Sequence, residues 1–142
     1  MLRPMCKAKL HGVTVTEANL QYVGSITIDQ NLLDAADLLP FEWLHVANVA
    51  TGDRFETYAI AGERGSGIIG LNGATARLGA SGDTLIIMSY AYFSPDELRT
   101  FQPRLVFVDA ANQPLHLAAT EAARQSFCVS DPDATSSGGA GG

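Results

Sequence analysis

The sequence has few cysteines and no long hydrophobic run. Its 142 residues include two cysteines, Cys6 and Cys128, and no Cys-x-x-Cys pair. The three histidines lack zinc-finger spacing, so we expect two unconnected reduced thiols and no metal site. No apolar stretch approaches the ~20 residues that cross a bilayer, and the first residues lack the apolar segment of a secretory signal. We therefore expect a cytoplasmic protein that does not bind membranes.

Basic residues are also scarce. Nine Lys and Arg residues stand against fifteen Asp and Glu residues, which gives a formal net charge of −6. A protein that binds nucleic acid mainly by neutralising phosphates needs the opposite balance. We expect no nucleic-acid partner. Hydrophobic residues make up 46% of the chain, so one domain of this length can bury a sizeable core.

The familiar catalytic motifs are missing. The sequence contains no Gly-x-Ser-x-Gly, no His-Glu-x-x-His, no phosphate-binding Gly-x-x-x-x-Gly-Lys and no dinucleotide fingerprint. Residues 62–67 are rich in glycine, but the segment that follows does not begin a helix that could bind phosphate. Standard motifs therefore indicate no particular chemistry.

Short strand patterns dominate the chain. We expect strands at residues 11–16, 22–28, 43–49, 54–60, 83–93, 104–109 and 115–117. The apolar run of residues 85–88 predicts a strand buried on both faces. Asp29 can cap a helix over residues 30–39, and Ser94 with Glu97 forms a capping box before a second short helix. This pattern favours a mainly β fold, a small closed or nearly closed barrel over residues 1–129. Residues 130–142 have the Gly/Ser-rich composition of a disordered tail.

The dipeptide Gly24-Ser25 interrupts one of the strand patterns. A serine hydroxyl can attack the preceding carbonyl carbon and move the acyl group from nitrogen to oxygen, if the backbone is strained. Glycine permits such a strained geometry. Gly-Ser dipeptides are common, and Gly65-Ser66 is a second one here. The dipeptide alone therefore does not predict self-cleavage.

Several blocks of sequence, taken in order and spacing, carry a family resemblance. The blocks are Lys9-Leu10-His11, Tyr22-Val23-Gly24-Ser25, Asp34-Ala35-Ala36, residues 54–60, Gly62-Glu63-Arg64-Gly65-Ser66, Asn72-Gly73-Ala74 and Gln102-Pro103-Arg104. Together they resemble the bacterial pyruvoyl-dependent aspartate 1-decarboxylases over roughly residues 1–110. The resemblance implies a six-stranded double-psi β-barrel and a homotetramer with active sites between neighbouring subunits. A separate maturation factor is a possible further partner in this family.

The resemblance also implies a self-made cofactor. The chain would cut itself between Gly24 and Ser25 into residues 1–24 and 25–142, and Ser25 would become a pyruvoyl group. This group would be the only cofactor, with no metal and no pyridoxal phosphate. Its carbonyl condenses with an amine and accepts the electron pair that decarboxylation leaves. The implied reaction converts L-aspartate to β-alanine and carbon dioxide, for pantothenate and coenzyme A synthesis.

Residues 54–60 carry three of the site residues that the resemblance implies. Tyr58 would donate a proton to Cα after carbon dioxide leaves, and Arg54 would bind a substrate carboxylate. Thr57 would bind substrate and activate the cleavable peptide. If this segment is a strand, Arg54 and Tyr58 share a face with their Cα atoms ~13 Å apart, and Thr57 points to the other face.

The remaining implied site residues are Lys9 and a loop. Lys9 is the second cation for substrate carboxylates, and which carboxylate Lys9 and Arg54 each contact stays open. The substrate-binding loop comprises Asn72, Gly73, Ala74 and Thr75.

Four positions depart from the family pattern. Gly12 replaces the usual arginine, Thr75 and Arg77 replace an alanine and a histidine, and Ala47 stands where some members have an aromatic residue. These changes concern substrate affinity or processing more than the fold.

Two alternatives remain open from the sequence. One is an uncleaved β-barrel interaction module without enzymatic activity. The other is a pyruvoyl decarboxylase that prefers another acidic amino acid such as glutamate, because one methylene changes binding by only ~1–3 kcal/mol.

Overall fold

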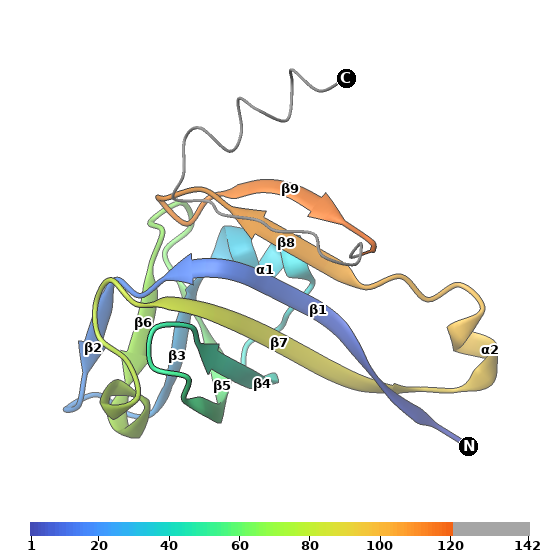
Figure 1. The fold of residues 1–142 in the computed structure, drawn as a ribbon, viewed down its shortest axis with the longest axis horizontal. Coiled ribbons are helices and arrows are strands. Elements are labelled where there is room, and N and C mark those ends of the chain that lie inside the picture. The colour runs from blue at the N-terminus through green and yellow to red at the C-terminus, as the bar shows by residue number, and fades with distance from the viewer. Residues whose placement is uncertain (121–142) are drawn as a thin grey trace.

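A computed structural model describes residues 1–120 and has nine strands, two α-helices and one 3₁₀-helix (Figure 1). The elements are β1 (Arg3–Thr14), β2 (Glu17–Asn19), β3 (Ser25–Asp29), α1 (Gln30–Ala36), β4 (Trp43–Asn48), β5 (Arg54–Gly62), β6 (Ile69–Asn72), η1 (Gly73–Arg77), β7 (Thr84–Phe93), α2 (Pro95–Leu98), β8 (Arg104–Val108) and β9 (Pro114–Ala118). The predicted mainly β fold is confirmed.

All nine strands join one sheet, in the order β2-β6-β3-β5-β4-β7-β1-β8-β9. Three neighbouring pairs are parallel, namely β1 with β8, β2 with β6 and β3 with β5, and the others are antiparallel. The long strands β1 and β7 lie side by side across the molecule, with α1 packed nearby (Figure 1). One cluster of buried side chains, including Leu10, Ile26, Leu44 and Leu85, fills the interior.

The sheet differs from the six-stranded closed barrel that we expected. The structure has nine strands, and the described pairings do not join the end strands β2 and β9 to each other. Short segments account for part of the difference, because a strand of three residues such as Glu17–Asn19 pairs at the sheet edge without a clear alternating pattern.

Local signals placed several elements correctly. The strands predicted at residues 43–49 and 54–60 are present as β4 and β5, which form an antiparallel hairpin with pairs from Trp43–Tyr58 to Ala47–Arg54. The capping box of Ser94 and Glu97 begins α2 as expected. Asp29 caps α1, but the helix ends at Ala36 rather than Leu39, because Asp37 adopts a left-handed conformation with φ 55°.

Two strand predictions were incomplete. Strand β1 begins at Arg3, well before the predicted start, because its first half pairs with β7 and its middle also pairs with β8. The run Leu85-Ile86-Ile87-Met88 is not buried on both faces. Leu85 and Ile87 are buried, whereas Ile86 and Met88 are only partly covered, so β7 has one inner and one outer face.

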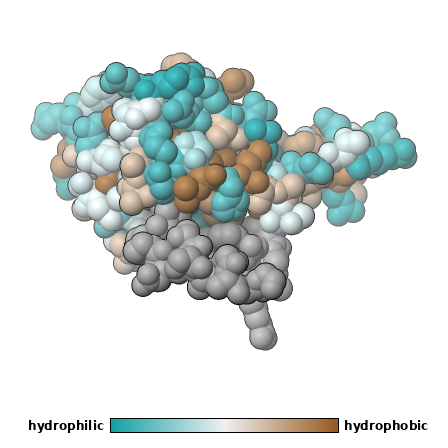
Figure 2. Space-filling model, turned by 90° about the horizontal axis from the view of Figure 1, so that it is seen from above, coloured by the Kyte–Doolittle hydropathy of each residue, from teal (hydrophilic) through white to brown (hydrophobic). Residues whose placement is uncertain are grey.

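Large hydrophobic side chains also remain on the surface. The exposed ones on or near β4 and β7 include the aromatic residues Phe41, Trp43, Tyr90 and Tyr92. Figure 2 shows apolar residues gathered in a patch on the face seen from above, beside a mostly hydrophilic arm. Contiguous exposed apolar surface commonly marks an interaction site.

The predicted tail at residues 130–142 and the thiol of Cys128 lie outside the described residues. Cys6 is partly buried, and its thiol donates a hydrogen bond to the Ala8 carbonyl oxygen at 3.5 Å. Across residues 1–120, no helix combines the length and apolar character that spanning a membrane requires.

Candidate active site

Ser25 is both buried and strained. It begins β3 with a φ of 109°, and only 2% of its surface is exposed. A residue with a side chain in such a conformation costs on the order of 1–3 kcal/mol, and such strain clusters at functional sites. We expected Gly24 to supply the unusual geometry, but its φ lies outside the left-handed range. The strained torsion is instead the φ of Ser25, which is the rotation about the bond between Cα and the nitrogen of the Gly24–Ser25 peptide bond.

The loop that begins at Asn72 holds Ser25 at two of its atoms. Asn72 pairs with Ser25 between β6 and β3, and its Nδ2 donates to Ser25 Oγ at 3.2 Å and to Thr27 Oγ1 at 2.9 Å. Thr75 Oγ1 lies 3.2 Å from the Ser25 carbonyl oxygen and 2.8 Å from the Asn72 carbonyl oxygen. The hydroxyl and the carbonyl of one residue are therefore both positioned by this loop.

Gly73 packs directly on the backbone of Gly24. Its φ is 62°, and a Cβ at this position would lie 2.9 Å from Gly24 Cα and 3.0 Å from Gly24 N. Only glycine fits this approach without displacing the segment that precedes Ser25. This contact packs the loop against the residue that precedes Ser25. Ala74, the next residue of the predicted loop, is exposed.

Strand β5 places Tyr58 beside Ser25. Ile26 pairs with Ala59 in parallel register, so the preceding residues of the two strands, Ser25 and Tyr58, lie level with each other. Among residues 1–120, no hydrogen bond joins Thr57 to Gly24, the residue before the peptide bond that Thr57 is expected to activate. Phe41 stacks on the Tyr58 ring at a centroid distance of 5.7 Å.

The two cations share one outer face with Tyr58. Arg54 and Tyr58 alternate along β5 as expected, and Arg54 pairs with Ala47 while Thr57 pairs with the buried Leu44. Lys9 lies on β1 opposite Met88. In the sheet, β5, β4 and β7 separate β1 from β3, so Lys9 is four strand spacings, roughly 19 Å along the sheet, from Ser25.

Sequence reasoning missed some neighbours of these residues. His45 Nδ1 lies 3.5 Å from Glu56 Oε1, and both line a hollow of about 540 Å³ beside Arg54. Thr27 shares the Asn72 amide with Ser25. Ser25 and Thr27 are two residues apart in a predicted strand, so the sequence could have predicted that their hydroxyls lie on the same face.

The structure shows the conformation and exposure of the positions that depart from the family pattern. Gly12 has a φ of 81° at a register shift in β1, a conformation that glycine adopts readily. Arg77 is exposed at the end of η1, and Ala47 is partly buried opposite Arg54.

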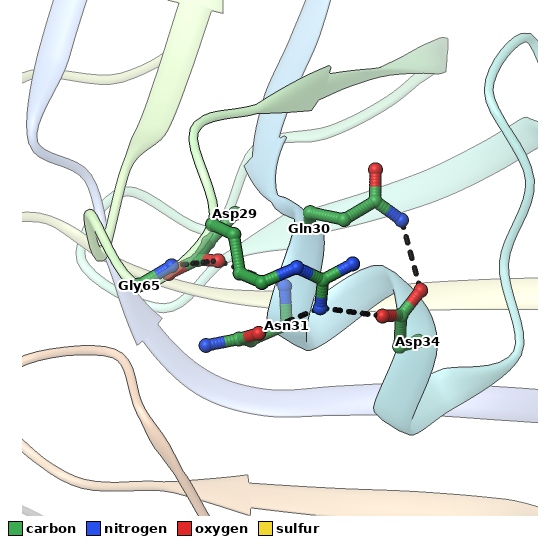
Figure 3. Close-up of polar contacts among 6 residues, drawn as sticks. Asp29, Gln30, Asn31, Asp34 and Gly65 are labelled. Carbon is green, nitrogen blue, oxygen red and sulfur yellow. Dashed lines mark hydrogen bonds and ion pairs between the residues drawn. The ribbon is translucent and has the colours of Figure 1, made fainter.

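The far end of β3 is anchored by Asp29 (Figure 3). Its buried carboxylate accepts hydrogen bonds from the backbone of Asn31, Gly65 and Gly67 at 2.8–2.9 Å and from Gln113 Nε2 at 3.3 Å. Burial by itself would raise the pKa of Asp29, but these hydrogen bonds outweigh it and lower the pKa. The strand that carries Ser25 is therefore fixed at its other end.

Arg64 completes this anchor. Its Nη1 donates to Asn31 Oδ1 at 2.8 Å and to Asp34 Oδ2 at 2.7 Å (Figure 3). The resemblance blocks around Asp34 and Arg64 thus meet in a contact that links α1 to the loop before β6, and their role here is structural.

A comparison with known families agrees with this arrangement. A family model described as aspartate decarboxylase matches residues 1–115. The match includes Ser25, Tyr58 and the loop that begins at Asn72, and it extends through β8. The chain therefore belongs to the aspartate decarboxylase family, and it is a decarboxylase.

Proposed function

We propose that this chain is a pyruvoyl-dependent aspartate 1-decarboxylase that cleaves itself between Gly24 and Ser25. It converts L-aspartate to β-alanine and carbon dioxide for pantothenate and coenzyme A synthesis in the cytoplasm. The observation that carries this proposal is Ser25, a buried serine with positive φ whose hydroxyl and carbonyl are both hydrogen-bonded.

Self-cleavage begins with the strained peptide. Ser25 Oγ attacks the Gly24 carbonyl carbon and forms a C–O bond. The hydroxyl proton passes to the Ser25 nitrogen as the C–N bond breaks, which leaves an ester and a free amine. The amide of Asn72 fixes Ser25 Oγ for this attack. A water molecule then removes the Ser25 Cα proton, the Cα=Cβ bond forms and the Cβ–O bond breaks. Addition of water and loss of ammonia leave the pyruvoyl group at residue 25.

The surroundings of Ser25 suit this group. When present, the pyruvoyl group supplies a carbonyl that binds the substrate amine and withdraws electrons from its Cα. Tyr58, on the neighbouring strand, donates the proton that replaces the lost carboxylate. Asn72, Gly73, Ala74 and Thr75 bound the site, and Thr57 lies on the inner side of β5.

Arg54 and Lys9 bind the substrate carboxylates. A cation serves the reaction best on the carboxylate that aspartate keeps, because strong binding of the departing one stabilises the ground state more than the transition state. Arg54 can bind a carboxylate through two hydrogen bonds. Its exposed position at the start of β5 leaves it accessible to a substrate.

The complete site combines two copies of the chain in a homotetramer. Lys9 is distant along the sheet from Ser25 of its own copy, and exposed aromatic side chains provide apolar surface for association. The fold implied for each subunit is the double-psi barrel. The three parallel pairs, β1–β8, β2–β6 and β3–β5, within a mostly antiparallel sheet support that arrangement.

Product formation from L-aspartate tests the proposal. Purified chain should release β-alanine, detected by NMR, whereas Ser25→Ala should release none. Ser66→Ala is the matched control, because it alters the other Gly-Ser dipeptide, which is exposed and whose hydroxyl donates to the Glu63 carbonyl oxygen. Equal activity of Ser25→Ala and the wild type would overturn the proposal. Faster turnover of L-glutamate than of L-aspartate would identify glutamate as the preferred substrate. A purified chain that stays uncut but matures in cell extract would show that a maturation factor is required.

A further inference from the structure

The hydroxyl of Thr75 lies beside an atom that changes charge during self-cleavage. Thr75 is 8% exposed, and its Oγ1 lies 3.2 Å from the Ser25 carbonyl oxygen. This carbonyl is on the C-terminal side of the bond that breaks, so it stays within β3 throughout the reaction. The pairing of Ser25 with Asn72 holds it there.

The second chemical step places negative charge on that oxygen. When the Ser25 Cα proton leaves to water, the electron pair on Cα is shared with the adjacent carbonyl oxygen. The pair then forms the Cα=Cβ bond, and the Cβ–O bond breaks to release the Gly24 carboxylate. A donor at the carbonyl oxygen therefore stabilises the transition state of elimination.

We propose that Thr75 is this donor and that it accelerates the elimination step of self-cleavage in this chain. The inference rests on the proposed function. Thr75 replaces the alanine usual in the resembling family, so its hydroxyl sets the rate of maturation rather than making maturation possible. The first step, attack on the Gly24 carbonyl carbon, does not involve this hydroxyl.

The hydroxyl has one proton and two acceptors. Before the reaction, the Asn72 carbonyl oxygen at 2.8 Å is closer to Thr75 Oγ1 than the Ser25 carbonyl oxygen at 3.2 Å. A hydrogen bond to a charged oxygen is roughly twice as strong as one to a neutral oxygen. The Thr75 hydroxyl therefore turns its hydrogen toward the Ser25 carbonyl oxygen as negative charge develops there. The contact then stabilises the transition state more than it stabilises the resting chain.

Trapping the ester separates this role from a merely structural one. Freshly translated wild type, Thr75→Val and Thr75→Ser are incubated with and without hydroxylamine, and the fragments are followed by denaturing mass spectrometry. Thr75→Val should produce blocked residues 25–142 roughly 10–100-fold more slowly. Hydroxylamine should still cleave it through the ester, leaving a free amine on Ser25. Thr75→Ser keeps the donor and should mature at nearly the wild-type rate.

Thr84→Val is the matched control, since it removes a hydroxyl from a partly covered strand residue on β7. Thermal unfolding checks that each variant folds, and Thr75→Ala replaces Thr75→Val if valine cannot be accommodated. Maturation of the folded Thr75 variant at the wild-type rate would overturn the inference alone. Resistance of that variant to hydroxylamine would also overturn it, because the defect would precede the ester. A wild-type chain that never cleaves would overturn the proposed function as well.

Discussion

The side chain of Tyr58 is positioned by strand pairing and by one aromatic contact. The parallel register of β3 and β5 places it level with Ser25, and the Phe41 ring stacks on it at 5.7 Å. These contacts fix the phenol without any role in breaking the Gly24–Ser25 bond. Processing and turnover should therefore depend on different side chains.

Tyr58→Phe separates the two activities. The variant keeps the ring and its stacking on Phe41, so it should fold and cleave like the wild type. Its turnover of L-aspartate should fall by roughly 10²–10⁴, the usual contribution of a positioned acid. Mass spectrometry reports cleavage and β-alanine release reports turnover. Wild-type turnover by the cleaved variant would remove Tyr58 from the mechanism.

Gly73 gives a second prediction at the residue scale, which concerns self-cleavage. In Gly73→Ala, the new Cβ would meet Gly24 Cα at 2.9 Å, so the segment before Ser25 must shift. We expect the chain to remain largely uncut. Gly82→Ala is the control, because Gly82 also has positive φ but a Cβ there meets nothing within 4 Å. Comparable cleavage of the two variants, measured over the same time, would contradict the importance of this close approach.

The sequence pointed to these residues only in part. Gly24-Ser25 and the turn residues Asn72 and Gly73 were recognisable as a set through their resemblance to a family. The positive φ of Ser25 was not, because a single backbone torsion depends on the loop packed against it rather than on the dipeptide.

At the scale of elements, α1 and the loop before β6 share one anchor. Asp29 ends β3, caps α1 and accepts backbone hydrogen bonds from Gly65 and Gly67. Sequence predicted the cap, because an aspartate directly precedes the helical pattern. It could not predict the contacts with residues 36 and 38 positions away, which arise only when the strands pair.

Asp29→Asn should destabilise the fold by about 2–4 kcal/mol, since the new amide would face donors at Gly67 and Gln113. The wild-type pKa of Asp29 is lowered from 3.8, so its contribution is present above that pH and is lost as the pH falls below it. The difference in unfolding free energy between wild type and variant should therefore shrink in acid. Urea unfolding at neutral and acidic pH measures it.

The exposed Asp34→Asn variant, which loses only the contact with Arg64, is the control and should change stability little. A constant difference between Asp29→Asn and wild type from neutral to strongly acidic pH would show that the Asp29 charge is not the source of stability.

At the scale of the whole molecule, the sheet separates Lys9 from Ser25, two residues that the proposed mechanism brings into one site. Composition and alternation were sufficient for a mainly β fold. They did not give the strand order, because β1 and β8 or β3 and β5 pair across long stretches of sequence. That order places Lys9 far along the sheet from Ser25, and the proposal of a site shared between copies rests on this separation.

Mixed assemblies test the shared site. Ser25→Ala lacks the cleavage residue and Lys9→Met lacks the cation, so each alone should be inactive. Coexpressed copies should recover about a quarter of wild-type activity if each site takes one residue from each neighbour. Activity no higher than that of the separate variants would place the whole site within one chain.

The most direct test of the central claim is a mass measurement. Protein that is first shown to be catalytically active is denatured, and the masses of its polypeptides are then measured. The account predicts two polypeptides, residues 1–24 and residues 25–142, the second beginning with a pyruvoyl group that reacts with ketone reagents and has no free amine. A single mass for the unbroken chain in fully active protein would contradict it, as would an ordinary serine amine at the start of the larger fragment.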